Sequence, residues 1–183
     1  WYMLIKPTLS RAGALSNESD QYAELVDQLV YLVRDAGLMS YADIGFRDDG
    51  EANRQSGLNA HVVLFSEKVG HAGFLKEMAA RYQISTLALG GQPSVLTVEY
   101  FVRDLKTRGV DLRRSFYLFS VVDYDTSGWI IRDSFVKNLR AFGIKNIKVV
   151  DLVNPDALSP SEIEASKFRI PEDRSSSPKN KEW

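Results

Sequence analysis

The sequence contains no cysteine among its 183 residues. This absence excludes disulfide bonds, thiolate metal sites and cysteine nucleophiles, so a metal site would have to use Asp, Glu or the two histidines, His61 and His71. Long hydrophobic runs are also missing: no apolar stretch approaches the length of a membrane span, and no basic region followed by a hydrophobic stretch opens the chain. We therefore expect a cytoplasmic protein that does not contact a membrane.

An excess of either charge sign is absent as well. The 23 Lys and Arg residues nearly balance the 24 Asp and Glu residues, and the formal net charge of -1 argues against a generally basic surface that coats nucleic acid. Any DNA contact would have to be focal. Two sets of basic residues are candidates for phosphate contacts, although such sets are more often solvated helix faces. They are Arg103, Lys106, Arg108, Arg113 and Arg114, and then Arg132, Lys137 and Arg140.

From His61 onwards the sequence alternates between strand and helix patterns. Runs of β-branched and aromatic residues predict strands at 61–66, 84–89, 116–122 and 148–153, and apolar residues at helical spacing predict a helix in each interval. Strands separated by single helices imply right-handed crossovers and a mainly parallel sheet. We therefore predict an α/β fold with a mainly parallel four-stranded sheet and helices on both faces.

The segments on either side of this α/β region have other patterns. Apolar residues on one helical face predict a helix over 22–36 that Gly37 ends, and the Asp, Gly and Asn of residues 43–60 predict a loop or short hairpin. Residues 159–162 can open a short helix, whereas the polar and basic residues 171–183 predict a tail or truncated linker. The predicted domains are thus residues 1–60, 61–158 and 159–183.

Carboxylates follow two of the predicted strands. Asp123 and Asp125 come after the third strand, and Glu67 comes after the first. Because the carboxyl ends of parallel strands meet at one edge of a sheet, we expect the three acids there, where they suit a hard cation such as Mg²⁺. Three such carboxylates favour metal-centred phosphoryl transfer more than a lone Asp-x-Asp does. The alternative is that Asp125, Thr126 or Ser127 only caps the helix that follows.

A loop of Gly-Gly-Gln-Pro-Ser, residues 90–94, lies between these carboxylates in the sequence. Its paired glycines permit close approach of the backbone to a phosphate, and its proline stiffens the turn. Lys68 is a further candidate at the phosphate, although a lysine after a strand is more often only solvated. The candidate phosphate or DNA contacts are therefore Lys68, Gly90, Gly91, Gln92 and Ser94, and Ser94 is also a candidate N-cap.

In their order along the chain, these motifs resemble the Toprim domain of topoisomerases and primases. More narrowly, Ser-Glu-Lys at 66–68, Gly-Gly-Gln-Pro-Ser at 90–94 and Asp-Tyr-Asp-Thr-Ser-Gly at 123–128 resemble the A subunit of DNA topoisomerase VI and its relatives that make meiotic double-strand breaks. The resemblance covers residues 61–153. It is weakest at Thr126 and Ser127, because the family's loop commonly reads Asp-x-Asp-Pro-His-Gly.

The resemblance also implies that residues 1–60 hold the remnant of a winged-helix domain, followed by a linking helix and a loop. In this family the second member of an aromatic-Tyr pair attacks DNA, and Trp1-Tyr2 is similar to that pair. Tyr2 is therefore the candidate nucleophile, the alternative being an ordinary residue of an apolar strand. Since most of a winged-helix domain is absent from these residues, we expect activity of the full-length protein rather than of this fragment alone.

The function that the resemblance implies is Mg²⁺-dependent cleavage of double-stranded DNA by tyrosine transesterification, as in a type IIB DNA topoisomerase. Glu67, Asp123 and Asp125 would hold Mg²⁺, and Glu67 could alternatively act as a general acid or base. The tyrosine and the metal site of one active centre come from different subunits in this family, which implies a homodimer. ATP would be hydrolysed by a separate B subunit of the GHKL type. The family's location is the nucleoid of a prokaryotic cytoplasm or the nucleus of a eukaryote.

Two other functions stay open. Residues 120–126 resemble the first motif of phosphatases of the haloacid dehalogenase type, in which Asp123 would be a covalent nucleophile. That motif normally opens its fold, however, and this alternative leaves Glu67 without a role. The other possibility is a non-catalytic DNA-binding module that keeps the Toprim fold and does not cleave DNA.

Overall fold

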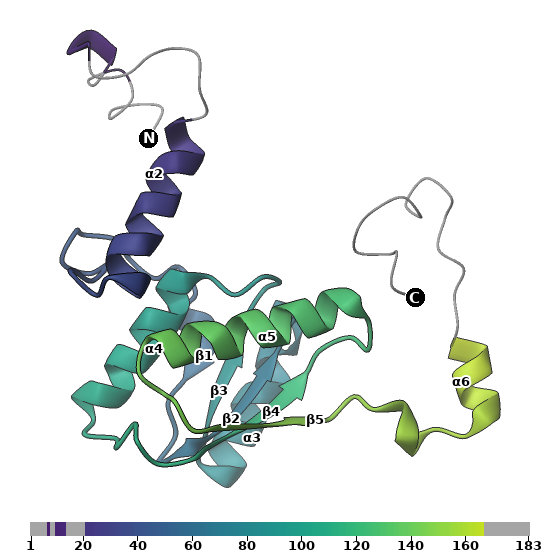
Figure 1. Cartoon of the computed structure of the whole chain (residues 1–183). Helices are drawn as coiled ribbons and strands as arrows, with labels where there is room; N and C mark the ends of the chain where they lie inside the picture. Colours follow the sequence, from purple (N-terminus) through teal and green to yellow (C-terminus); the bar gives the residue numbers. More distant parts are fainter. Residues whose placement is uncertain (1–6, 8–9, 14–20, 167–183) are drawn as a thin grey trace, which may run out of the picture. The chain divides into compact units, whose positions relative to one another are not determined.

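The computed structural model describes residue 7, residues 10–13 and residues 21–166. By its internal contacts the chain divides into two compact units, Trp1–Phe46 and Arg47–Trp183. The sheet belongs to the second unit (Figure 1). Tyr2, the candidate nucleophile, lies outside the described residues.

The described part of the first unit is mainly helical. Helix α2 (Gln21–Val30) continues into the π-helical turn η1 (Tyr31–Asp35), and Val33 is buried. The helix predicted over 22–36 is thus confirmed. Gly37 follows with a φ of 62°, a left-handed conformation that glycine adopts without steric penalty, which explains why the helix stops there.

The second unit contains a five-stranded sheet in which four strands are parallel. Strand β2 pairs with β3 on one side and with β4 on the other, and β5 pairs with β4. The prediction of an α/β fold with a mainly parallel sheet is confirmed, but the number of four strands is wrong. The strands, in spatial order, are β1 (Arg54–Gln55), β3 (Ile84–Ala88), β2 (Asn59–Ser66), β4 (Phe116–Val121) and β5 (Ile147–Asp151).

The additional strand, β1, is two polar residues long and runs antiparallel to β3. It has no β-branched or aromatic run, so the sequence pattern alone did not distinguish it from the surrounding loop. Residues 47–60, which the sequence assigned to the linking region, therefore contribute a strand to the sheet unit. The pairing depends on the course of the chain past β3 rather than on local propensity.

Helices cover both faces of the sheet, as predicted. The side chains of Val63 and Phe65 in β2 join the main core with α4 and α5, whereas Leu64 joins a smaller cluster under α3. This alternation is the two-residue period of a strand buried on both sides. The helices are α3 (Ala72–Tyr82), α4 (Val95–Thr107), α5 (Thr126–Ala141) and α6 (Pro160–Ser166), with short turns η2 (Glu51–Asn53), η3 (Val69–His71) and η4 (Pro155–Ala157).

The main core is built from large side chains that are fully buried. Phe65, Phe101 and Phe135 each have no exposed surface, and the rings of Phe65 and Phe135 lie 4.7 Å apart between centroids. Each such side chain stabilises the fold by about 1.5–3 kcal/mol relative to an exposed one. This packing fixes α4 and α5 against the sheet and thereby the loops at its edge.

The strand order creates a switch point between β2 and β4. After β2 the chain passes through α3 to β3 on one side, whereas β4, on the other side of β2, continues into α5 on the opposite face. The loops that leave β2 and β4 therefore diverge. In open α/β sheets, ligands bind in the crevice at such a switch point, beyond the carboxyl ends of the strands.

Candidate functional site

Glu67 and Asp123 lie at this switch point. Ser66 at the end of β2 pairs with Val121 at the end of β4, and the backbone N–H of Glu67 donates to the carbonyl of Val121 at 3.2 Å. The carboxylate of Glu67 lies beside the other loop, where its Oε2 is 3.4 Å from the backbone nitrogen of Asp123. Two of the three predicted acids are therefore brought together by the pairing of their strands.

The ammonium of Lys68 lies beside one of these acids, Asp123. Its Nζ lies 2.9 Å from Oδ1 and 2.8 Å from Oδ2 of Asp123, although both side chains are 52% exposed. The hydrogen bond from Asp123 raises the pKa of Lys68 above its ordinary value, and the charges of Asp123, Glu67 and Asp125 raise it further. The negative charges of all three acids therefore act on the ammonium of Lys68.

Asp125 has a different position, at the start of α5. It is the N-cap residue, and its Oδ1 accepts a hydrogen bond from the backbone N–H of Gly128 at 2.7 Å. The capping alternative for Asp125 is thus confirmed. The cap does not by itself exclude a second role, because a carboxylate has two oxygens and several lone pairs.

Position 128, in the first turn of α5, has room only for glycine. A Cβ atom at position 128 would lie 2.1 Å from the carbonyl oxygen of Asp123, a distance that no packed atoms adopt. The close approach lets the first turn of α5 fold back against the Asp123 backbone. The glycine five residues after Asp123 is therefore explained by this steric contact.

Within residues 7, 10–13 and 21–166, no three Asp, Glu or His side chains are arranged closely enough to hold a metal ion. The contacts explain this: the Asp123 carboxylate faces Lys68, Asp125 caps α5, and Glu67 lies against the Asp123 backbone. Glu67, Asp123 and Asp125 carry the carboxylate oxygens that Mg²⁺ prefers as ligands, but in the described residues these three side chains do not meet at one point.

The 90–94 loop packs beside Glu67. Gly90 and Gly91 have φ angles of 71° and 99°, as expected for a turn that needs glycine. The backbone N–H of Gly91 donates to the carbonyl of Glu67 at 2.9 Å. This N–H would be a donor to a phosphate bound at the loop, but here it is already hydrogen-bonded within the protein. Gln92 donates to Ser134 of α5 at 2.8 Å, and Ser94 occupies the N-cap of α4 without a side-chain capping bond.

The sequence did not predict a contact between Ser66 and His71 at this edge of the sheet. Ser66 is fully buried, and its hydroxyl oxygen lies 2.6 Å from Nδ1 of His71 in η3. The sequence separates the two by the Glu67 loop, and no motif links them. His61, the other histidine, lies at the opposite end of β2, where its Nε2 is 3.0 Å from the carbonyl oxygen of Asp111.

A fourth acid, Asp151 at the end of β5, also lies at the carboxyl edge. It accepts a hydrogen bond from the buried hydroxyl of Ser120 and an ion pair from Arg132 of α5 at 2.6 Å. Burial acts to lower the pKa of Arg132, but Asp133 and Asp151 outweigh it and the pKa is raised. Asp151 was hidden in the sequence because it lies inside the run predicted as a strand, 148–153, whereas the strand of the structure ends at Asp151. Its contacts hold α5 to β5.

The other predicted phosphate contacts have intramolecular partners in several cases. Arg103 lies over the ring of Tyr100 at 4.4 Å, Arg108 donates to the carbonyl of Gly57, and Arg113 forms an ion pair with Asp111. These contacts do not exclude DNA binding. They show that part of the predicted basic surface is engaged within the protein.

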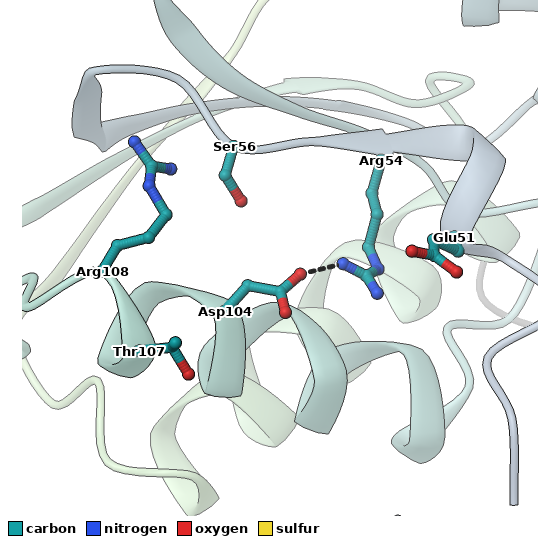
Figure 2. Close-up of a pocket in the computed structure, with 6 residues that line it drawn as sticks. All are labelled: Glu51, Arg54, Ser56, Asp104, Thr107 and Arg108. Carbon is teal, nitrogen blue, oxygen red and sulfur yellow. Dashed lines mark hydrogen bonds and ion pairs between the residues drawn. The ribbon is translucent and has the colours of Figure 1, made fainter.

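A cavity of about 420 Å³ lies away from these acids, between β1 and the C-terminal part of α4 (Figure 2). Its central feature is Arg54, which pairs with Asp104 in Figure 2 and with Asp48 at 2.8 Å. The side chains of Arg54 and Asp48 are only 8% and 2% exposed. The cavity is lined by Glu51, Arg54, Ser56, Asp104, Thr107 and Arg108.

The ion pairs of this cavity have a structural role. Asp48 accepts hydrogen bonds from Thr97 and from the backbone of Gly50 in addition to the Arg54 pair, so its buried charge is compensated. Burial acts to lower the pKa of Arg54, and Asp48 and Asp104 more than offset this, so the pKa is raised. The network ties the segment before β1 to α4.

Comparison with protein-family models, with curated proteins and with solved structures finds no match. Among the residues that the structure describes, no helix is both long enough and apolar enough to cross a membrane.

Proposed function

We propose that residues 61–158 form a Toprim domain and that the chain is a fragment of the catalytic A-type subunit of a type IIB DNA topoisomerase. The proposal extends the α/β fold to a named domain on the basis of the three motifs at 66–68, 90–94 and 123–128. The observation that carries it is the meeting of Glu67 and Asp123 at the switch point, with a cation held at Asp123. Strand ends of this kind are where parallel sheets place their chemistry.

In this proposal Glu67, Asp123 and Asp125 hold Mg²⁺. The metal would supply charge stabilisation at a DNA phosphate during transfer of the phosphodiester to a tyrosine hydroxyl. Glu67, whose Oε2 lies 3.4 Å from the backbone nitrogen of Asp123, would alternatively act as a general acid or base. Lys68 and the residues of the 90–94 loop, Gly90, Gly91, Gln92 and Ser94, would border the phosphate.

The remaining parts of the machinery come from outside the described residues. Tyr2 is the proposed nucleophile, and a tyrosine with an ordinary pKa of about 10 needs a nearby base or cation to act at neutral pH. The partners we propose are double-stranded DNA, a second copy of the chain and a separate ATPase subunit of the GHKL type. The proposed location is the nucleoid or, in a eukaryote, the nucleus.

The test is DNA cleavage by the full-length protein. We expect Glu67→Ala, or Asp123→Ala combined with Asp125→Ala, to abolish Mg²⁺-dependent cleavage while the far-ultraviolet circular dichroism stays unchanged. Glu77→Ala, which removes an exposed acid from α3, is the matched control and should cleave normally. Unchanged cleavage in the first two variants would remove the metal assignment.

The nucleophile requires its own experiment. Tyr2→Phe in the full-length protein should no longer form a covalent protein–DNA adduct, because the transferred phosphodiester then has no hydroxyl to accept it. The adduct is detected after denaturation by its slower migration on a gel. An adduct formed by Tyr2→Phe places the nucleophile elsewhere.

A second candidate is a non-catalytic DNA-binding module of the same fold. The observation in its favour is that Asp125 is used as a cap and that the described residues contain no preformed group of three metal ligands. Such a module would bind DNA equally well with and without Mg²⁺. The phosphatase alternative is less favoured, because its motif normally opens the fold and that function leaves Glu67 unused.

A further inference from the structure

We propose that the amino edge of the sheet, the edge at which its parallel strands begin, is a surface that binds the phosphate backbone of double-stranded DNA. The surface consists of two loops and the helix ends that precede them, residues 106–116 and 140–147. The choice of DNA as the polyanion rests on the proposed function, whereas the charge of the surface does not depend on it. The inference adds a DNA contact at the opposite end of the strands from Glu67 and Asp123.

The fold brings these two segments together. The C-terminal ends of α4 and α5 lead into β4 and β5 at the same end of the sheet, where the first strand residues, Phe116 and Ile147, pair with each other (Figure 1). The side-chain amide of Asn146 donates to the carbonyl of Arg113 at 2.8 Å, and the backbone N–H of Phe116 donates to the carbonyl of Asn146 at 2.8 Å. Members of both basic sets predicted from the sequence therefore contribute to one surface.

Basic side chains outnumber acidic ones on this surface. Its two segments contain one acid, Asp111, whose carboxylate forms an ion pair with Arg113 at 3.0 Å. Among the residues that the structure describes, neither Lys106 nor Arg114 forms an ion pair, and both are exposed. The surface therefore carries a positive charge although the whole chain has a formal net charge of -1. The basic residues of the two segments are Lys106, Arg108, Arg113, Arg114, Arg140 and Lys145.

The helix ends account for only part of this charge. Lys106 and Arg140 lie in the last turns of α4 and α5, where the partial negative charge of a helix end favours a cation. The ammonium of Lys145 donates to the carbonyl of Arg140 at 2.9 Å, at the same helix end. Arg113 and Arg114 lie in the loop before β4, and the effect of the dipole does not extend beyond the last turn. Exposed guanidinium groups of this kind suit phosphate, which accepts paired hydrogen bonds from arginine.

The two ends of the strands carry opposite charges. Glu67, Asp123 and Asp151 lie at the ends of β2, β4 and β5, so the carboxyl edge repels a phosphate unless a cation intervenes. The amino edge attracts a phosphate directly. Duplex DNA carries one negative charge per about 1.7 Å of its axis, and each phosphate that a basic side chain neutralises releases condensed counterions. The surface should therefore bind DNA without a metal ion and without a preference for base sequence.

The experiment measures binding of the 183-residue chain to a fluorescently labelled duplex of about 20 base pairs by anisotropy, over a series of NaCl concentrations. EDTA is present throughout, so the measurement does not depend on the proposed metal site. We expect Arg114→Gln and Lys145→Gln each to weaken binding about three- to tenfold at low salt. Each variant should also reduce the slope of log K against log[NaCl] by about 1, because one phosphate contact is removed.

Lys76→Gln is the matched control, because it removes one exposed positive charge from α3, on the opposite face of the sheet from α4 and α5. It should bind DNA like the parent chain. Equal weakening by Lys76→Gln would show a response to net charge alone and overturn the surface. Parent-like binding by both Arg114→Gln and Lys145→Gln, or no binding by the parent chain at low salt, would overturn it as well.

A second probe, poly-glutamate, tests the choice of DNA. If it binds as tightly as the duplex and the same variants weaken it equally, the surface recognises acidic polypeptides and the assignment to DNA is wrong. Failure of the surface leaves the proposed cleavage site untouched, because none of its residues is assigned to that site. Conversely, unchanged cleavage by full-length Glu67→Ala would remove the metal assignment while duplex binding in EDTA stayed as measured.

Discussion

The protein contains two clusters in which basic side chains pair with aspartates, and the clusters differ in how far they are exposed to solvent. At the carboxyl edge, Lys68 and Asp123 form a pair in which both side chains are 52% exposed. Beside β1, Arg54 pairs with Asp48, and these side chains are 8% and 2% exposed. Water and salt weaken the first pair, whereas burial makes the second difficult to break. The exposed pair should therefore be easier to separate than the buried one, and it is the exposed pair that lies at the carboxyl edge, where we propose the functional site.

The largest expected effect breaks the buried cluster. Arg54→Met keeps most of the apolar stem but leaves the Asp48 carboxylate buried without its cation. We expect the free energy of unfolding to fall by about 3–5 kcal/mol, as measured by urea denaturation. A loss below about 1 kcal/mol would show that the two clusters do not differ in the way we describe.

The second effect concerns the backbone that carries Asp123. Gly128→Ala places a Cβ 2.1 Å from the Asp123 carbonyl, so we expect a loss of about 1–3 kcal/mol as the loop shifts. Gly73→Ala in α3 is the matched control, because a Cβ there meets no atom within 4 Å. That control should be neutral or stabilising by up to about 1 kcal/mol, since alanine favours a helix. Equal thermal unfolding of both variants contradicts the steric role of Gly128.

A third variant separates the two roles of Asp125. Asp125→Ala should destabilise the protein by about 1 kcal/mol through loss of the N-cap bond to Gly128. Asp125→Ser keeps a capping oxygen but removes the carboxylate, so its thermal stability should stay near that of the parent. If Asp125 also binds a metal, Asp125→Ser should bind Mn²⁺ more weakly than the parent protein in a titration followed by electron paramagnetic resonance of the free ion. Parent-like Mn²⁺ binding by Asp125→Ser would limit Asp125 to capping.

The smallest effect is expected for the exposed pair itself. Lys68→Met should change the free energy of unfolding by less than about 1 kcal/mol, because the pair is exposed and screened. The measurement is urea denaturation under the conditions used for Arg54→Met. A loss as large as that of Arg54→Met would make Lys68 a structural residue and remove the contrast between the two clusters.

Much of the fold could be predicted because its signals are local. The run from Val62 to Phe65 and the helical spacing of Phe135 and Leu139 are properties of neighbouring residues, and both elements were found. β1 was missed because two polar residues form a strand only through β3. The boundaries also moved: β5 ends at Asp151 rather than at Val153.

The candidate site was predicted in part for the same reason. Glu67 and Asp123 were expected at one edge of the sheet, because parallel strands bring their carboxyl ends together, and the Glu67 carboxylate lies beside the backbone of Asp123 there. The role of Asp125 was left open between ligand and cap, and the structure shows the cap. No sequence pattern distinguishes these two roles, since both require a short acidic side chain before a helix.

The sequence by itself determined the α/β alternation and the placing of Glu67 and Asp123 after strands, because strand and helix periods and the order of residues are local properties. Only the tertiary structure decided which charges meet. Lys68 and Asp123 stand 55 positions apart and Arg54 and Asp104 stand 50 apart, and each pair forms because β2, β4, β1 and α4 pack together. Burial also depends on that packing: it shields the pair of Arg54 with Asp48 from water and leaves the pair of Lys68 with Asp123 exposed.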